Sequence, residues 1–235
     1  MIQTNISSDK EIEHFDNLAE DYKATHDRAL AIAGGDSDFF YRAKIKLIQE
    51  NIRQKPNRIL DYGGGTGRLS RLLLNAFPNS MIHLFDPSEN SVEVAKMELG
   101  GTGRFTCSSN PEIDQGLFDL VTCAGVFHHI PRALWQKNMK RITKSMAKNG
   151  VIYVFEHNPI CPHAQILLYM ASLDRDANFL RSGTVTKLFR QSNLHPIKSQ
   201  FISFFPSNWK IFHPLERYLG WNPLGAQHMS IARKA

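Results

Sequence analysis

The chain has 235 residues, 42% hydrophobic and 21% charged, with three cysteines and a formal net charge of +6 at pH 7. This composition predicts a globular protein with a sizeable core in a reducing cytoplasm, and the scattered cysteines exclude a disulfide framework or a cysteine-rich metal site. No apolar run approaches the roughly 18 residues of a membrane span, the N-terminus lacks a signal-peptide pattern, and the basic charge permits an anionic partner without requiring one.

Helices are predicted for the first part of the chain. Apolar side chains at near-helical spacing predict one helix or two short ones over residues 11–29, and a further helix over 39–54. Tyr22 and His26 are four residues apart, so they lie on one face of the first of these helices.

Strands and helices alternate in the middle of the chain. Apolar runs predict five strands, one that begins at Arg58 and four over residues 81–85, 104–107, 118–124 and 151–156. The helices between them are expected over 67–77, from Asp86-Pro87-Ser88 to Leu99, and from about Pro131 to Asn149-Gly150. This alternation predicts a parallel sheet with helices on both faces.

The regular alternation weakens after residue 156. We expect a short helix over 164–172, a second helix over 184–193, an irregular hydrophobic cover over 195–225 and a final strand over 227–233. The cover is rich in Phe, Trp and Pro. Its aromatic residues fit ordinary core packing as well as an apolar pocket wall or a lipid-facing patch.

A glycine-rich stretch follows the first strand and reads RILDYGGGTGRLS from Arg58 to Ser70. It places a tight turn between a strand and a helix N-terminus, which is where doubly wound α/β proteins seat a nucleotide-like cofactor. The dinucleotide motif is excluded because Arg68 stands where its third glycine should be, and the P-loop is excluded because no Gly-Lys-Ser/Thr ends the stretch. An acidic residue and three alternating glycines remain: Asp61, Gly63, Gly65 and Gly67.

This pattern resembles motif I of the class I S-adenosylmethionine (SAM)-dependent methyltransferases. The resemblance implies that Asp61 orders the loop near the cofactor's amino group, while the glycine backbone runs beside the methionine and ribose parts. The glycines concerned are Gly63, Gly64, Gly65 and Gly67. The alternative is a glycine-rich turn that holds no ligand.

The same resemblance implies a fold and a division of the chain. The fold is a doubly wound, mostly parallel, seven-stranded Rossmann-like α/β sheet that ends in a hairpin with one antiparallel strand. Residues 1–55 would form a helical N-terminal cap, 56–156 the SAM-binding core, and 157–235 the rest of the core with a segment that covers the substrate. Related enzymes fold an N-terminal helix over the cofactor, so Tyr22 is a candidate to close the site; a surface helix that packs its aromatic stripe is an equal alternative.

Asp86 ends the second strand about 20 residues after the glycine loop, at the offset where an acidic residue reaches ribose hydroxyls. The resemblance assigns Asp86 and Pro87 to the cofactor. The alternative is that Asp86 only caps the next helix, a role that Ser88 can also fill. At the end of the third strand the family usually offers an acid to adenine; none is present, so a hydroxyl or backbone group of Cys107 or Ser108 would substitute.

The fourth strand and its loop, FDLVTCAGVFHHI, resemble motif IV of small-molecule methyltransferases, in which Ala124 and Gly125 would back the cofactor. His128 and His129 are adjacent and cannot share one face. We therefore expect one histidine that is partly buried and bonded to backbone, and one that lines the pocket. A metal site is not expected, because no third ligand has suitable spacing.

The fifth strand ends in FEHNP, which with the segment from Glu216 to Gln227 resembles a bacterial subgroup of these methyltransferases. An acceptor that must lose a proton benefits from a base whose pKa lies near 7. The candidate catalytic residues are His157 first, then His128, His129 and His26, with Glu156 beside them. For each histidine the alternative is a structural or pocket-lining role.

The sequence thus predicts a SAM-dependent methyltransferase for a small-molecule acceptor, such as a sugar, a lipid precursor or another metabolite. A basic stripe follows the fourth strand on one helix: Lys137, Lys140, Arg141, Lys144 and Lys148. We expect this stripe to be solvated, and nucleic acid is therefore not the expected partner. Two alternatives stay open: an RNA or protein methyltransferase, and a SAM-binding scaffold without catalysis.

Overall fold

The computed structural model describes residues 37–162 and 178–235. The helices expected over 11–29 and 164–172, and with them Tyr22 and His26, lie outside the described residues. The strands are β1 (Arg58–Tyr62), β2 (Met81–Phe85), β3 (Phe105–Ser108), β4 (Phe118–Ala124), β5 (Met146–His157), β6 (Leu194–Ile202) and β7 (Gln227–Lys234). The α-helices are α2 (Ser37–Asn51), α3 (Arg68–Ala76), α4 (Glu89–Leu99), α5 (Trp135–Ser145), α7 (Ser182–Gln191) and α8 (Glu216–Leu219).

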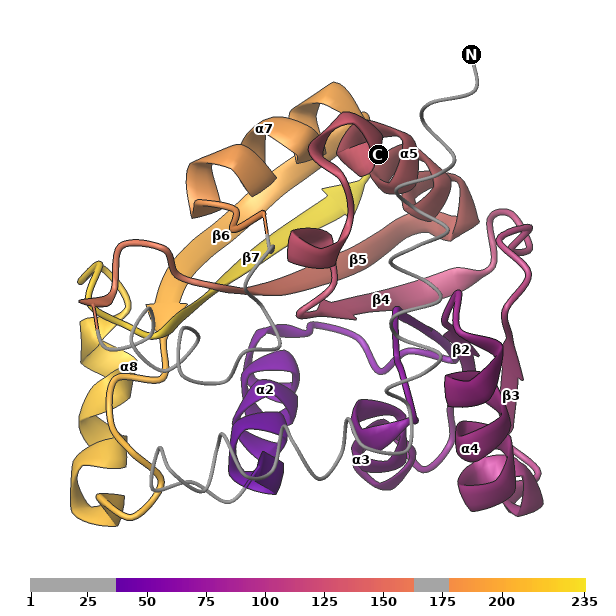
Figure 1. Ribbon diagram of the computed structural model, residues 1–235, viewed down its shortest axis with the longest axis horizontal. Helices are drawn as coiled ribbons and strands as arrows, with labels where there is room; N and C mark the ends of the chain where they lie inside the picture. Colours follow the sequence, from indigo (N-terminus) through magenta and orange to yellow (C-terminus); the bar gives the residue numbers. More distant parts are fainter. Residues whose placement is uncertain (1–36, 163–177) are drawn as a thin grey trace.

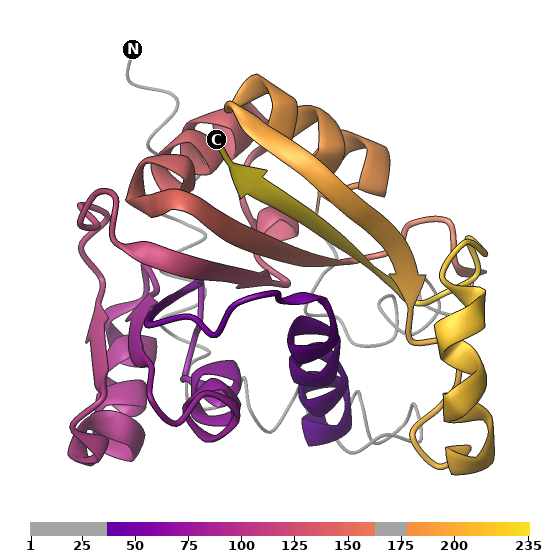
Figure 2. The same ribbon diagram turned by 180° about the vertical axis from the view of Figure 1, so that it is seen from behind.

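The seven strands form one sheet in the order β3-β2-β1-β4-β5-β7-β6. All neighbours pair in parallel except β7, which runs antiparallel to both β5 and β6. Helices α2, α3 and α4 cover one face and α5 and α7 the other, as Figures 1 and 2 show. The structure therefore confirms the doubly wound, mostly parallel α/β sheet with one antiparallel strand.

Two layers of apolar side chains hold the helices on the sheet. One layer joins α5 and α7 to the strands through side chains such as Met139 and Phe189. The other joins α2, α3 and α4 to the opposite face and contains Ile48, Leu73 and Ala95. Helix α2 is thus part of the core layer. Among the described residues, none of the helices has the length and apolar character needed to cross a lipid bilayer.

Two boundaries differ from the sequence prediction. The helix expected to reach Asn149-Gly150 ends at Ser145, and β5 starts at once with Met146. Asn149 adopts a positive φ of 64°, and a Cβ on Gly150 would lie 2.8 Å from the carbonyl oxygen of Phe118, so the Asn-Gly pair bends the strand beside the neighbouring β4. It does not end a helix.

The second difference concerns the cover predicted over 195–225. Its first part is the edge strand β6, whose pairing with β7 shifts register between Pro196 and Lys198. An edge strand tolerates Pro196 because the N–H that proline lacks is one that such a strand can spare. Residues 203–226 then form short turns, with a 3₁₀ helix at Lys210–Leu215 followed by α8. The final strand is confirmed.

Candidate active site

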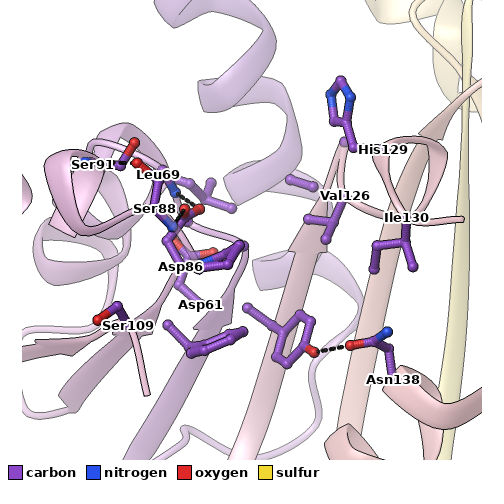
Figure 3. Close-up of a pocket in the computed structure, with 18 of the residues that line it drawn as sticks. Asp61, Leu69, Asp86, Ser88, Ser91, Ser109, Val126, His129, Ile130 and Asn138 are labelled. Carbon is purple, nitrogen blue, oxygen red and sulfur yellow. Dashed lines mark hydrogen bonds between the residues drawn. The ribbon is translucent and has the colours of Figure 1, made fainter. Parts of the chain in front are cut away.

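A cavity of about 530 Å³ opens at the carboxyl ends of β1, β2 and β4. The strand order reverses at β1: the chain goes from β1 to β2 and β3 on one side, and then to β4 and β5 on the other side. A crevice forms at this point, between the connections that leave β1 and β4. In Figure 3, Asp86, Ser88 and Leu69 form one wall, and Val126, Ile130 and His129 form the opposite wall. The volume lies in the range of small-molecule sites.

The glycine loop lies against the ends of two strands. Gly63 and Gly64 donate their N–H groups to the carbonyl oxygen of Phe85, at 2.7 and 3.2 Å. Gly63 has a φ of +71°, and a Cβ there would lie 2.6 Å from the side chain of Val126. Only glycine fits this close approach. Gly63, Gly64 and Gly65 line the cavity, whereas Gly67 is buried at the start of α3 and does not.

Asp61 is a buried carboxylate at the edge of the cavity. Its Oδ2 accepts a hydrogen bond from the Ser70 hydroxyl at 2.8 Å, and its Oδ1 accepts one from the Thr122 hydroxyl at 2.9 Å. Burial raises the pKa of Asp61, and the two hydrogen bonds lower it. The effect of burial is the larger one, so the pKa rises to about 6. Two neutral hydroxyls hold the carboxylate, so a cationic group of a ligand would relieve its desolvation.

Asp86 joins the glycine loop to the start of α4. Its Oδ2 accepts the N–H of Gly65 at 2.8 Å, and its Oδ1 accepts the N–H of Ser88 at 3.0 Å. The cap of α4 is Ser88, whose hydroxyl oxygen accepts the N–H of Ser91 at 3.1 Å. Asp86 and Pro87 line the cavity, where a carboxylate can accept hydrogen bonds from ligand hydroxyls.

The end of β3 contributes a different residue from those expected. Ser109 lines the cavity, and Cys107 and Ser108 do not. The thiol of Cys107 lies 3.7 Å from the carbonyl oxygen of Val92, and Ser108 Oγ accepts the N–H of Asn110 at 2.9 Å. Both side chains are engaged elsewhere. The strand runs one residue further than predicted, which shifts the cavity-facing position to Ser109.

Helix α5 supplies a wall that the sequence did not reveal. The hydroxyl of Tyr62 donates to Asn138 Oδ1 at 2.6 Å, the contact drawn in Figure 3. Burial raises the pKa of Tyr62 to about 12, so this phenol stays protonated. Lys137 and Arg141 also line the cavity, although Lys137 itself is exposed to solvent, as are Lys140, Lys144 and Lys148, in agreement with the expected solvated stripe. The sequence held one indication of this wall: Lys137 and Arg141 are four residues apart, which places them on one face of the helix.

The two adjacent histidines have different surroundings. His129 lines the cavity. His128 is buried, and its Nδ1 lies 2.6 Å from Glu156 Oε2, so a carboxylate holds this ring. Burial lowers the pKa of His128, which keeps the ring neutral with Nδ1–H as the donor. The two rings lie 4.0 Å apart between centroids.

Glu156 fixes the loop that carries these histidines. Its Oε1 accepts the N–H groups of Val126 and Phe127 at 3.1 and 2.7 Å, while Oε2 holds His128. Burial raises the pKa of Glu156, and the bond from Phe127 opposes this shift. Glu156 does not line the cavity, so the structure gives it a positioning role for the loop after β4.

His157, the first candidate base, does not line the cavity either. Its ring centroid lies 5.1 Å from that of His128 and 6.2 Å from that of Phe179. Burial lowers the pKa of His157 well below its ordinary value. Of the four candidate histidines, the three in the described part of the chain are His128, His129 and His157, and among these His129 alone reaches the cavity.

Known proteins resemble this chain in sequence. The family model of a methyltransferase domain matches residues 37–199. A malonyl-[acyl-carrier protein] O-methyltransferase of Neorickettsia risticii is 24% identical over 112 residues, 47% of this chain and 42% of that protein. The chain spans less than half the length of the curated relatives that it matches.

Solved structures share the fold. A SAM-dependent methyltransferase of Thermotoga maritima superimposes with a TM-score of 0.67 at 14% identity, over 96% of this chain and all of that one. Magnesium protoporphyrin IX methyltransferase of Synechocystis, solved with bound S-adenosylhomocysteine, gives a TM-score of 0.66 at 13% identity, over 96% and 99% of the two chains. Identities this low establish the architecture alone.

Proposed function

The chain belongs to the methyltransferase domain family, with the class I fold and SAM as its cofactor, and from this premise we propose that it methylates a small-molecule acceptor. The observation that carries the proposal is the cavity of about 530 Å³ at the glycine loop, which has the size of a small-molecule site. The magnesium protoporphyrin IX methyltransferase named above supports a metabolite as acceptor, whereas the curated relative acts on a malonyl group held by a carrier protein.

The residues of the cavity fit SAM. Asp61 would hold a cationic group, Asp86 would accept from ribose hydroxyls, and the loop from Gly63 to Gly65 would let the ligand approach the backbone. Apolar walls, including Val126, would pack against the flat adenine. When bound, the cofactor supplies an electrophilic methyl group on its sulfonium, so the protein mainly has to orient the acceptor and exclude water.

We propose that His129 is the base that takes the proton from the acceptor. Its place on the cavity wall supports this role, and its N–H bond to the carbonyl oxygen of Val126 at 3.2 Å holds its backbone. The His128 ring lies beside that of His129, tilted from it by 47°, and is itself fixed by Glu156. Glu156 and His128 would then position His129 without touching the acceptor.

Thermal unfolding with SAM, S-adenosylhomocysteine and NAD tests cofactor binding. A ligand at about 100 times its dissociation constant stabilises by roughly 2.7 kcal/mol, which for a protein of this size raises the midpoint by about 5–10 °C. We expect this rise with the two adenosyl ligands and not with NAD. A rise with NAD alone would overturn the assignment.

Transfer from SAM with a tritiated methyl group identifies the class of acceptor. After incubation with a cell extract, we expect label in the low-molecular-weight or lipid-soluble fraction. Label in precipitated protein or RNA would contradict the small-molecule proposal and favour the macromolecular alternative. Binding without transfer to any fraction would favour the scaffold.

Exchange of His129 tests the proposed base. His129→Gln is expected to lower kcat by about 10²–10⁴-fold and to remove the acidic limb of the pH profile, with SAM affinity nearly unchanged. His195→Gln, on the exposed edge of β6, is the matched control and should behave like the wild type. If His129→Gln keeps the wild-type kcat and pH profile, the residue only lines the pocket.

A further inference from the structure

The segment between β6 and β7, residues 203–226, exposes a row of large apolar side chains. Each of the residues in the row is between 42% and 78% exposed: Trp209, Phe212, Leu215, Tyr218, Trp221 and Leu224. Ile211 beside them is 81% exposed. Single exposed apolar residues are ordinary, but a row of this kind marks an interaction surface.

The row has a regular spacing of three residues. Lys210–Leu215 is a 3₁₀ helix with three residues per turn, so side chains three positions apart lie on one face. The ring centroids of Trp209 and Phe212 are 5.7 Å apart, which shows that neighbours in the row touch. Tyr218 lies in the short helix α8, and Trp221 and Leu224 follow in the turns after it.

Hydrogen bonds fix the inner side of the segment to the sheet. Phe201 donates its N–H to the carbonyl oxygen of Gly220 at 2.8 Å. The side-chain amide of Asn158 donates to the carbonyl oxygens of Pro223 and Gly225, at 2.7 and 2.8 Å. The exposed row is therefore the outer face of a well-tied element. Figures 1 and 2 place α8 at the end of the molecule opposite α4.

The charges of the segment are arranged unevenly. Its acidic residue, Glu216, turns inward and accepts the N–H groups of Phe204 and Phe205, both at 3.2 Å. Lys210 and Arg217 stay exposed, and the Arg217 guanidinium lies 4.6 Å from the ring of Tyr218. The outer face thus combines aromatic and aliphatic side chains with positive charge alone.

We propose that residues 203–226 dock the protein on the surface of an anionic lipid bilayer. Trp and Tyr are the side chains preferred where a membrane meets water, because one end of each ring system is apolar and the other is polar. Lys210 and Arg217 complement anionic headgroups at the same face. The site lies apart from the cavity, so it adds an interaction to the proposed function and does not depend on it.

Vesicle binding tests the proposal, with phosphatidylcholine alone and with about one third phosphatidylglycerol. We expect the protein to sediment with the anionic vesicles and to be released by salt. Of its three tryptophans, Trp135 is buried, whereas Trp209 and Trp221 are exposed. Brominated lipids should therefore quench most of the emission on binding, with a shift to shorter wavelength.

Variants locate the contact. Trp221→Ser is expected to weaken vesicle binding about tenfold, and Lys210→Gln and Arg217→Gln about fivefold each. Met97→Ser is the matched control, because Met97 is 70% exposed on the distant α4, and it should bind vesicles like the wild type.

Two outcomes would overturn the docking proposal. One is an absence of vesicle binding by wild-type protein that still unfolds cooperatively. The other is binding that Trp221→Ser does not weaken. Light scattering distinguishes a further occupant: self-association that Trp221→Ser abolishes, without vesicle binding, would assign the row to a second copy of the chain.

Discussion

Replacing Asp61 with asparagine is expected to weaken SAM binding about a hundredfold while leaving the unliganded protein at least as stable at pH 7. The loss of affinity follows because an amide cannot compensate the charge of a cationic ligand group in a buried site. Isothermal titration with SAM measures it. Asp119→Asn is the matched control: Asp119 accepts the N–H groups of Asn57 and Arg58 at the other end of β1, away from the cavity.

The stability part of this prediction has a defined pH dependence. Burial raises the pKa of Asp61 from 3.8 to about 6. The folded protein binds this proton more tightly than the unfolded chain, so the carboxyl group contributes stability below pH 3.8, and that contribution is lost as the pH rises through about 6. At pH 7 ionisation costs roughly 3 kcal/mol, which Asp61→Asn avoids.

Urea unfolding of both proteins between pH 4 and pH 8, without ligand, checks this difference. The free energy of unfolding of the wild type should fall relative to that of Asp61→Asn as the pH rises. A variant that is less stable than the wild type at pH 7 would mean that the carboxylate serves the fold. Normal SAM affinity of the variant would remove Asp61 from the cofactor site.

Replacing Glu156 with alanine is expected to lower the free energy of unfolding by about 3–5 kcal/mol. Two backbone N–H groups and the His128 ring would lose their acceptor inside the protein. The buried Lys44, whose pKa burial lowers to about 8, would also lose the opposite charge that partly offsets this shift. For a protein of this size the midpoint should fall by roughly 6–20 °C.

One further variant separates the hydrogen bonds of Glu156 from its charge, and a second serves as the control. Glu156→Gln keeps an oxygen for the loop N–H groups and should lose clearly less stability than the alanine variant. Glu93→Ala, on the exposed side of α4, should change stability by no more than about 0.5 kcal/mol. If Glu156→Ala unfolds at the wild-type temperature, the carboxylate does not hold the loop after β4.

The fold could be predicted well from the sequence, because the apolar runs and turn residues that indicate its strands and helices are local. Strands β2 and β4 begin and end at the expected residues, since each is an apolar run bounded by turn residues. Asp61, Asp86 and the glycine loop reach the cavity because a strand end, a tight turn and a helix start place them there whatever the rest of the chain does. The predicted end of α5 was wrong, because Asn149 and Gly150 bend β5 beside the neighbouring strand β4 and this contact is not visible in the local sequence.

The remaining part of the site depends on contacts between distant segments. Strand alternation places Glu156 and His157 on opposite sides but does not reveal that Phe179 lies beside His157. Nothing local to α5 indicates that Asn138 meets Tyr62, 76 residues earlier in the chain. Adjacent histidines look equivalent in a sequence, and only the packing around Glu156 separates His128 from His129.

The position of β7 in the sheet has a consequence for how the chain folds as it is made. This strand lies between β5 and β6, although it follows both in the sequence. Until the ribosome has delivered residues 227–234, one edge of β5 has no partner, and β6 has no strand to join. Non-local pairing of this kind is intrinsically slow, and until it is complete the open edge of β5 is exposed to pairing with other chains.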